Sequence, residues 1–160
     1  YLPLSATVAT TPLWDAFLGS YAQSKTFFHG HTFGGNPLAA AAALATLDIF
    51  DEEETLRHLT AKSDFLAQCL APLKDHPHVG DVRQRGLIAA VELVRDRGRC
   101  DSFPWTERRG QRVCDFALSR GVWLRPLGDV VVVMPPLSIE QDELAQITDA
   151  VLDGIDRATG

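Results

Sequence analysis

Apolar residues recur at helical spacing through the middle of the chain. Between residues 51 and 77 they stand on one side of a helix, at Leu56, Leu59, Leu66, Leu70 and Leu73. The acidic run at residues 51–54 precedes them, and acidic side chains are favoured at a helix start because they interact well with the helix dipole. The pattern predicts one long amphipathic helix that begins at Asp51 and ends before Pro77.

The same spacing returns twice near the C-terminal end. A helix is predicted over residues 107–120, and Gly121 is predicted to end it. Its inward positions are Val113, Phe116, Ala117 and Leu118. A final helix is predicted to open with a capping box formed by Ser138 and Gln141. Its inward positions are Leu144, Ile147, Val151 and Ile155.

Other segments are predicted to be strands. Residues 1–10 and 87–94 alternate between apolar and polar residues. Strands are also predicted at residues 79–85, 122–125 and 130–134, with a turn at residues 126–129. A short helix is predicted to begin at Thr11-Pro12 and to end near Gly19. The fold class is therefore α/β. We predict that residues 1–50 are the tail of a larger domain, that residues 51–76 form a connecting helix and that residues 77–160 form a small C-terminal α/β domain.

Composition narrows the function classes. The chain has 160 residues, of which 46% are hydrophobic and 22% charged, values typical of globular proteins. A net charge of −6 argues against a nucleic-acid partner, and no apolar run approaches the roughly 20 residues that span a bilayer. Cys69, Cys100 and Cys114 are odd in number and widely spaced, which indicates free thiols and a cytoplasmic location.

A glycine-rich loop over residues 26–36 leads directly into the helix start Asn36-Pro37 and an alanine run. Gly30, Gly34 and Gly35 allow positive φ and close approach to a ligand. A helix N-terminus favours anions, so one interpretation is a phosphate site, and the other is an ordinary connector. His29 and His31 lack a third ligand nearby in sequence, so no metal site is expected, and His58, His76 and His78 are expected at the surface.

Arginines supply the second candidate chemistry. Arg125 ends a predicted strand and faces the same way as Trp123, so it could clamp a carboxylate, or it could be solvated or paired with a neighbouring acid. Arg83, Arg85 and Glu92 could form a functional cluster, although ion pairs at the sheet edge are the simpler interpretation.

Two segments resemble the class III pyridoxal-phosphate-dependent aminotransferases: His29-Gly-His-Thr-Phe-Gly-Gly-Asn-Pro-Leu-Ala39 and Trp123-Leu-Arg-Pro-Leu-Gly128 with Met134-Pro-Pro136. The resemblance implies the C-terminal part of a fold-type I transferase, with residues 1–50 as the tail of the large cofactor-binding domain. It implies that Thr32, with the backbone of His31, binds the pyridoxal phosphate of a partner subunit in a homodimer. It also implies that Gly30 lets substrate approach the backbone and that Arg125 binds the substrate carboxylate.

The same resemblance places the lysine that binds pyridoxal phosphate covalently upstream of Tyr1, so no catalytic residue is expected in these 160 residues. Of the lysines present, Lys62 and Lys74 fall on a charged amphipathic helix, and only Lys25 is near the glycine-rich loop.

Within the class, the resemblance is to the biotin-pathway enzymes, which form 7,8-diaminononanoate from 8-amino-7-oxononanoate with S-adenosylmethionine as amino donor. Departures occur at His31, Val132 and Leu137, where the family often has a proline or aromatic residues, and they leave the amino donor open. Two alternatives remain: another class III ω-aminotransferase, and a module that dimerises without catalysis.

Overall fold

The computed structural model describes residues 2–160, and the contacts within it form two units. The first unit ends at Glu53, and the second runs from Glu54 to Gly160. The division into a large-domain tail and a small domain stays a prediction. Within residues 2–160, no helix is long and apolar enough to cross a membrane.

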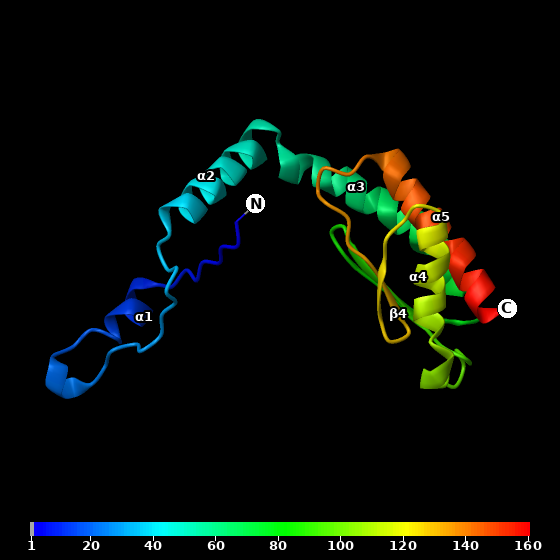
Figure 1. The fold of residues 1–160 in the computed structure, drawn as a ribbon, viewed down its shortest axis with the longest axis horizontal. Helices are drawn as coiled ribbons and strands as arrows, with labels where there is room; N and C mark the ends of the chain where they lie inside the picture. The colour runs from blue at the N-terminus through cyan, green and yellow to red at the C-terminus, as the bar shows by residue number, and fades with distance from the viewer. Residues whose placement is uncertain (1) are drawn as a thin grey trace. The chain divides into compact units, whose positions relative to one another are not determined.

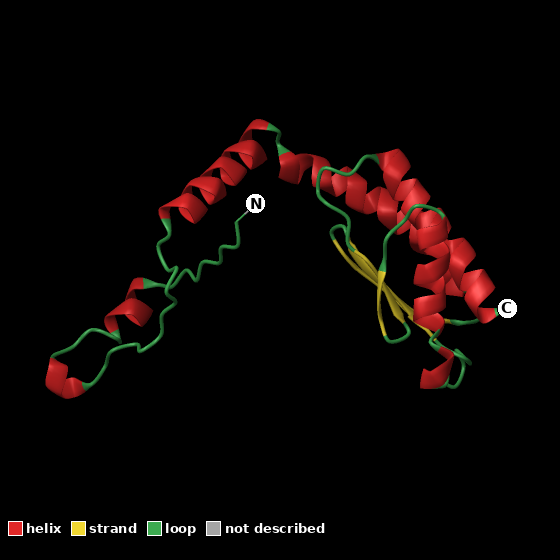
Figure 2. Ribbon diagram, in the orientation of Figure 1, coloured by secondary structure: helices red, strands yellow, loops and turns green. Residues whose placement is uncertain are grey.

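The first unit consists of helices and loops (Figure 2). Its helices are α1 (Thr11–Asp15), the 3-10 helix η1 (Tyr21–Gln23) and α2 (Pro37–Glu52). The predicted helix at Thr11-Pro12 and the helix start at Asn36-Pro37 are confirmed. The strand predicted over residues 1–10 is wrong for residues 2–10, which lie in no sheet, and Tyr1 lies outside the described residues. A strand needs a neighbour to pair its backbone groups, and this alternating segment has none in the described part of the chain.

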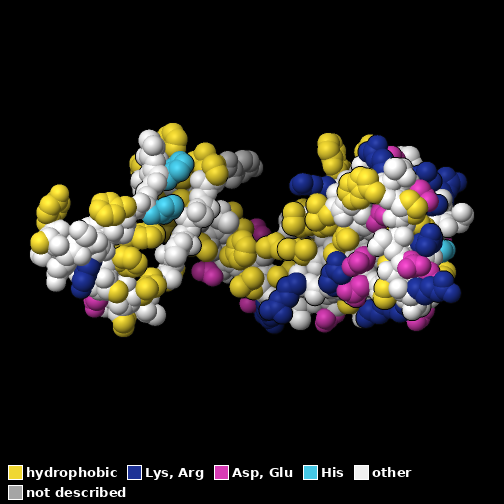
Figure 3. All heavy atoms as spheres, turned by 90° about the horizontal axis from the view of Figure 1, so that it is seen from below, with side chains coloured by type: hydrophobic (Ala, Val, Ile, Leu, Met, Phe, Trp, Pro, Cys, Tyr) yellow, Lys and Arg dark blue, Asp and Glu magenta, His cyan; other side chains and the backbone are white. Residues whose placement is uncertain are grey.

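Apolar side chains cover much of the surface of the first unit (Figure 3). Tyr21, Val8 and Phe28 are almost fully exposed, and Ala39 is the one buried residue among those described before Glu54. This unit therefore builds no hydrophobic core of its own, and its apolar surface is of the kind that other protein covers.

The long helix predicted from Asp51 is wrong at its start. Asp51 and Glu52 close α2, and a new helix, α3, spans Thr55–Leu70. The break falls at Glu54, whose φ of 46° lies in the left-handed region that a helix cannot continue through. The strong helix formers of the alanine run carry α2 past the point where the acidic run was expected to begin a helix. After Leu70 the chain continues as the 3-10 helix η2 (Ala71–Asp75), close to the predicted end.

The second unit contains a four-stranded antiparallel sheet of order β1-β2-β4-β3 (Figure 1). Its strands are β1 (Val79–Arg85), β2 (Ile88–Leu93), β3 (Arg125–Leu127) and β4 (Val130–Val133). The strands predicted at residues 79–85 and 87–94 are confirmed, whereas the predicted strand 122–125 is shifted. Leu127 pairs with Val130, so the turn shrinks to Gly128 and Asp129, a two-residue hairpin that Gly128 permits with its φ of 63°.

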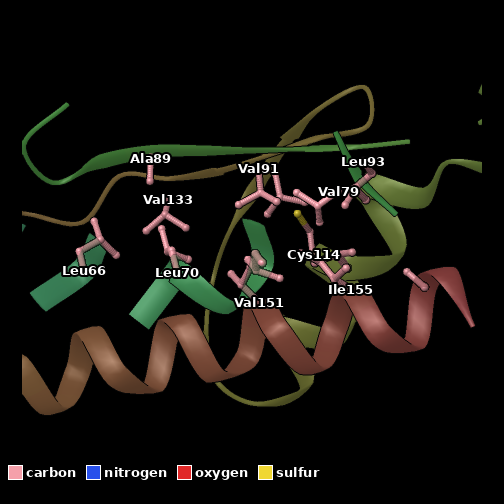
Figure 4. Packing of buried hydrophobic residues seen from close by; sticks show 14 of the residues in the cluster. Leu66, Leu70, Val79, Ala89, Val91, Leu93, Cys114, Val133, Val151 and Ile155 are labelled. Carbon is pink, nitrogen blue, oxygen red and sulfur yellow. The ribbon is translucent and has the colours of Figure 1, made fainter. Parts of the chain in front are cut away.

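Three helices pack on one face of this sheet: α3, α4 (Arg109–Ser119) and α5 (Gln141–Thr159). Figure 4 shows Ala89, Val91 and Val133 of the sheet pointing toward Leu70, Val151 and Ile155 of the helices. Alternation along each strand leaves the opposite face to a second set of side chains: Arg83 of β1, Ala90 of β2, Val132 of β4 and Arg125 of β3. The predicted inward positions of α5 are confirmed, Ile147 being half-buried.

Some local predictions about the helices are wrong. Leu56 and Leu118 are exposed, because the helix faces that carry them are not the ones that meet the sheet. The capping box of α5 is formed by Glu140 and Glu143 instead of Ser138 and Gln141. Ile139 is buried, and its N–H donates to the Pro136 carbonyl in a turn, so the helix starts two residues later than the sequence pattern indicates.

The N-terminus of α4 packs against the β3–β4 hairpin turn. Gly110 N–H donates to Asp129 Oδ1 at 3.0 Å, so the turn residue caps a helix distant in sequence. The 3-10 helix η3 (Trp105–Glu107) precedes α4, and the Trp105 ring lies against Gly128. Trp105 is therefore an anchor on the domain surface, as predicted, although most of its ring is exposed.

Asp129→Ala is expected to lower the free energy of unfolding by about 1–2 kcal/mol, because the Gly110 N–H loses its acceptor in a partly buried place. Asp129→Asn keeps an acceptor oxygen and should cost much less. Urea unfolding of the two variants measures the difference, and equal losses would contradict the capping role.

Candidate functional site

The glycine-rich loop holds its backbone together by short-range hydrogen bonds. Gly34 N–H donates to the His31 carbonyl at 2.8 Å, and Asn36 N–H donates to the Phe33 carbonyl at 3.1 Å. Phe33 N–H donates to His31 Nδ1 at 3.2 Å, which turns the imidazole back toward its own loop. Asn36 Oδ1 accepts from Leu38 N–H at 3.1 Å, the helix cap that the sequence predicted.

Thr32 lies at the exposed start of the turn in this loop. Neither its hydroxyl nor its backbone N–H makes a hydrogen bond within residues 2–160. Two adjacent donors of this kind are what a phosphate group accepts from, so the residues present fit the phosphate of pyridoxal phosphate.

Of the three loop glycines, only Gly35 takes positive φ, at 72°. Gly30 and Gly34 do not use the positive φ that their residue type allows. A Cβ on Gly30 would meet no atom of the described chain within 4 Å, so the fold itself does not require a glycine at this position. The close approach proposed at Gly30 is therefore that of a ligand to the backbone. His31 lines a hollow of about 630 Å³ with residues 2–5 and 33–36, whereas Thr32 and Gly30 lie outside it.

Arg125 opens β3 and lies on the face of the sheet that the helices leave uncovered. Its guanidinium makes no salt bridge or hydrogen bond within residues 2–160. It lines a hollow of about 500 Å³ together with Trp123, Val132 and Met134. The hydrogen-bonding fork of Arg125 is therefore available to a carboxylate.

Arg83 forms ion pairs at the sheet edge, which is the simpler of the two interpretations given for Arg83, Arg85 and Glu92. Arg83 Nη1 lies 2.7 Å from Glu92 Oε2 and 3.0 Å from Asp81 Oδ2. The hydrogen bond to Glu92, and next that to Asp81, raise the pKa of the Arg83 guanidinium. Arg85 makes no ion pair among the described residues, so the predicted trio does not form one cluster.

The three lysines differ in their surroundings. Lys62 Nζ donates to the Leu137 carbonyl at 3.2 Å, which joins α3 to the segment before α5. Lys74 stands in the last turn of η2. Lys25 follows η1 at an exposed position, and its side chain lies beside Gly19.

Two histidines expected at the surface are partly buried. The His76 and His78 side chains pack together, and His78 also packs on Phe103. His76 Nε2 lies 3.1 Å from Asp156 Oδ1 of α5, while His76 Nδ1 accepts from His78 N–H. No spacing in the sequence signals the contact of His76 with Asp156, since these two residues are 80 positions apart. They connect the start of β1 to the end of α5.

The thiols are free, as predicted, with Cys114 buried and Cys100 exposed. Burial, and then the charge of Asp115, raise the pKa of the Cys114 thiol to about 11. Only about one thiol in a thousand is ionised three pH units below its pKa, so Cys114 should react with iodoacetamide far more slowly than Cys100 at pH 8. Its rate should rise about tenfold per pH unit up to pH 10. Mass spectrometry of timed samples measures both rates, and equal rates at pH 8 would contradict the burial.

Comparison with known proteins places this fold and these loops in one family. The model of the aminotransferase class-III family matches residues 2–155. The chain therefore belongs to the class-III aminotransferases, and its α/β architecture is that of the C-terminal part of a fold-type I enzyme.

Individual relatives show which members of this family the chain resembles. The chain is 52% identical over 160 residues to the adenosylmethionine-8-amino-7-oxononanoate aminotransferase of Geobacter sulfurreducens, all of this chain matching 35% of that protein. The solved enzyme of the same name from Methanocaldococcus jannaschii superposes with a TM-score of 0.91 at 40% identity, over 98% of this chain and 36% of that one. An omega transaminase from Pseudomonas jessenii superposes with a TM-score of 0.77 at 34% identity, over 86% of this chain and 31% of that one. The chain thus spans about a third of the length of these relatives.

Proposed function

We propose that this chain is the C-terminal part of an aminotransferase that converts 8-amino-7-oxononanoate to 7,8-diaminononanoate, with S-adenosylmethionine as amino donor. The relatives from Geobacter sulfurreducens and Methanocaldococcus jannaschii, whose names state this substrate and donor, support the proposal along the whole chain. One observation in the structure carries it: the unpaired Arg125 guanidinium stands in a hollow with apolar walls. An oxononanoate ends in a carboxylate on an apolar carbon chain, and such a hollow complements both parts.

Arg125 binds the substrate by its carboxylate and so fixes the orientation of the far end of the molecule, where the keto group reacts. Holding one end of a flexible substrate removes part of the entropy cost of bringing the other end to the reacting group. The arginine is a binding residue and moves no proton.

The Thr32 hydroxyl and the backbone N–H groups at His31 and Thr32 bind the phosphate of pyridoxal phosphate. When bound, this cofactor supplies an electron sink for the transfer of the amino group. We expect the lysine that binds the cofactor covalently to lie outside these 160 residues, as the family resemblance implies, and Gly30 leaves room for the substrate beside the backbone. The cofactor that Thr32 serves belongs to the partner subunit.

We also propose a homodimer as the working assembly, because Thr32 is proposed to bind the cofactor of a partner subunit. We also propose a cytoplasmic location, in keeping with three unpaired cysteines, and small-molecule substrates as the ligands.

The full-length protein, loaded with pyridoxal phosphate, tests the proposed reaction. We expect mass spectrometry to detect 7,8-diaminononanoate when 8-amino-7-oxononanoate and S-adenosylmethionine are supplied, and little product with lysine or alanine as donor. Transfer to other keto compounds, without product from 8-amino-7-oxononanoate, would favour the omega transaminase alternative, which the Pseudomonas jessenii likeness supports.

The 160-residue chain by itself tests whether the lysine that binds the cofactor covalently lies outside these residues. The chain is mixed with pyridoxal phosphate and reduced with borohydride, and the mass of the protein is then measured by mass spectrometry. No stoichiometric adduct is expected, because none of its three lysines has the proposed covalent role. A single adduct at Lys25 would show that this chain binds the cofactor covalently itself and would contradict the assignment.

A further inference from the structure

One hollow of the second unit takes no part in the proposed reaction. It has a volume of about 200 Å³, and its walls are Trp105, Arg108, Gln111, Pro126, Gly128 and Asp129. Pro126 stands between Arg125 and Leu127 in β3, and successive residues of a strand point to opposite faces. This space, the Trp105 hollow, is therefore on the other side of the hairpin from the hollow that Arg125 lines.

Two opposite charges border the Trp105 hollow without pairing. Arg108 makes no ion pair within residues 2–160, and the adjacent Glu107 is bound to Arg109, whose Nε lies 2.7 Å from Glu107 Oε2. Asp129 accepts from Gly110 N–H with Oδ1, and its Oδ2 has no partner within the same residues. Arg108 and Asp129 also form no pair with each other, so a molecule that carries both charges can bridge the space between them.

The third wall is an indole. The Trp105 ring lies against Gly128, where a Cβ would come within 3.0 Å of ring atom Cζ3, while 78% of Trp105 is exposed. The ring is thus supported by backbone and leaves an apolar surface open. Gln111 supplies a further acceptor, because its Nε2 donates to Asp115 Oδ1 at 2.8 Å and its amide oxygen has no partner in the described chain.

The backbone of Arg108 gives a reason to look for a ligand at its side chain. Its φ of 50° lies in the left-handed region, which glycine adopts more readily than any other residue. The Arg108 guanidinium makes no hydrogen bond, ion pair or aromatic contact within residues 2–160 that would stabilise the fold in return. The arginine therefore has no structural task in the part of the chain that the structure describes.

We propose that the Trp105 hollow binds a free α-amino acid with an apolar side chain. The ammonium group donates to Asp129 Oδ2 and to the Gln111 amide oxygen. The carboxylate accepts from Arg108, and the apolar side chain covers the Trp105 ring. The inference does not rest on the proposed reaction.

The charges and the size of the hollow both favour this class of ligand. A simple anion would be repelled by Asp129 and a simple cation by Arg108, whereas a zwitterion is attracted by both. Sites for drug-sized ligands enclose roughly 300–1,000 Å³, so a hollow of about 200 Å³ suits a molecule as small as an amino acid.

The full-length protein labelled with 5-fluorotryptophan provides a local readout. The ¹⁹F signal of Trp105 is the one that Trp105→Phe removes, and we expect leucine to shift this signal until it saturates. Glycine keeps both charges but lacks four carbons. Burying a methylene completely is worth about fourfold in affinity, and about half of each is covered in an open hollow, so glycine should bind about tenfold more weakly.

Two analogues of leucine each lack one charge. Leucinamide lacks the carboxylate, and 4-methylpentanoate lacks the ammonium group. Each should bind about fivefold more weakly than leucine, the value of an ion pair at an open surface.

Matched variants assign each charge of the ligand to one wall. Asp129→Asn keeps the oxygen that caps Gly110 N–H, so the turn is preserved, and it should weaken leucine about fivefold without weakening 4-methylpentanoate. Arg108→Gln should weaken leucine about fivefold without weakening leucinamide. Arg112→Gln, at an exposed position of α4 outside the hollow, is the control and should leave leucine binding unchanged.

A Trp105 signal that leucine does not move would overturn the proposal, as would a leucine affinity that Asp129→Asn and Arg108→Gln leave unchanged. A leucine-induced shift that Arg125→Ala abolishes would also overturn it, because leucine would then act from the other side of the hairpin. The readout needs no turnover. If the full-length protein binds leucine at Trp105 and makes no 7,8-diaminononanoate, the proposed function fails and the amino-acid site stands.

Discussion

Replacing Arg125 with alanine is expected to raise the KM for 8-amino-7-oxononanoate about a hundredfold in the full-length enzyme. The guanidinium of Arg125 has no partner within residues 2–160 and would pair with the substrate carboxylate in a hollow with apolar walls. Losing a charged hydrogen-bonded pair of this kind costs about 2–3 kcal/mol, and every 1.4 kcal/mol is about tenfold in affinity. The amount of bound pyridoxal phosphate should stay the same, because Arg125 has no proposed contact with it.

Steady-state kinetics and the absorbance of the bound cofactor measure these two quantities on the same sample. Arg125→Lys keeps the charge but loses the planar fork, so it should recover only part of the affinity. Arg97→Ala is the matched control, an exposed arginine outside the hollow, and it should leave KM unchanged. If Arg125→Ala loses the cofactor along with the substrate, the assigned role is wrong.

Gly110→Ala is expected to destabilise the second unit by about 3 kcal/mol. A Cβ at this buried position would collide with the Gly128 carbonyl oxygen and would lie 3.1 Å from Asp129 Cα. Both neighbours are backbone atoms of a tight turn, which cannot move aside as a flexible side chain would, and overpacking of this kind costs about 1–3 kcal/mol or more.

The loss is measured as the shift in the urea midpoint at unchanged slope. Gly98→Ala is the control, because a Cβ there would meet only the end of the Asp96 side chain at 3.4 Å. A Gly110→Ala variant as stable as Gly98→Ala would show that α4 does not pack against the hairpin as described.

The sequence predicted the second unit better than the first for a physical reason. Strands β1 and β2 pair with each other, and β2 also pairs with β4, so their alternating pattern has a core to face. Residues 2–10 carry a similar pattern but have no partner strand among the described residues, and alternation by itself cannot make a sheet. The break at Glu54 was also beyond prediction, since a left-handed non-glycine residue leaves no mark in the apolar spacing.

Of the candidate site, the sequence predicted the cap at Asn36, because a helix cap depends on local residue types, whereas the carboxylate-binding role of Arg125 stays a prediction. It did not predict that Met134 would line the hollow beside Arg125, which follows from strand register. The hydrogen bond from Gly110 N–H to Asp129 and the contact between His76 and Asp156 each join residues that are distant in sequence. No spacing rule relates such residues.

The short turn at Gly128 and Asp129 has a consequence for how tightly a ligand can bind. The turn closes the hairpin that carries Arg125, and α4 fixes the same turn from outside the sheet through Gly110. The backbone that aims the guanidinium is therefore set before any carboxylate arrives, so binding need not restrict the hairpin further. In the proposed role of Arg125, part of its affinity for a carboxylate would therefore depend on the N-terminus of α4, which the carboxylate does not contact.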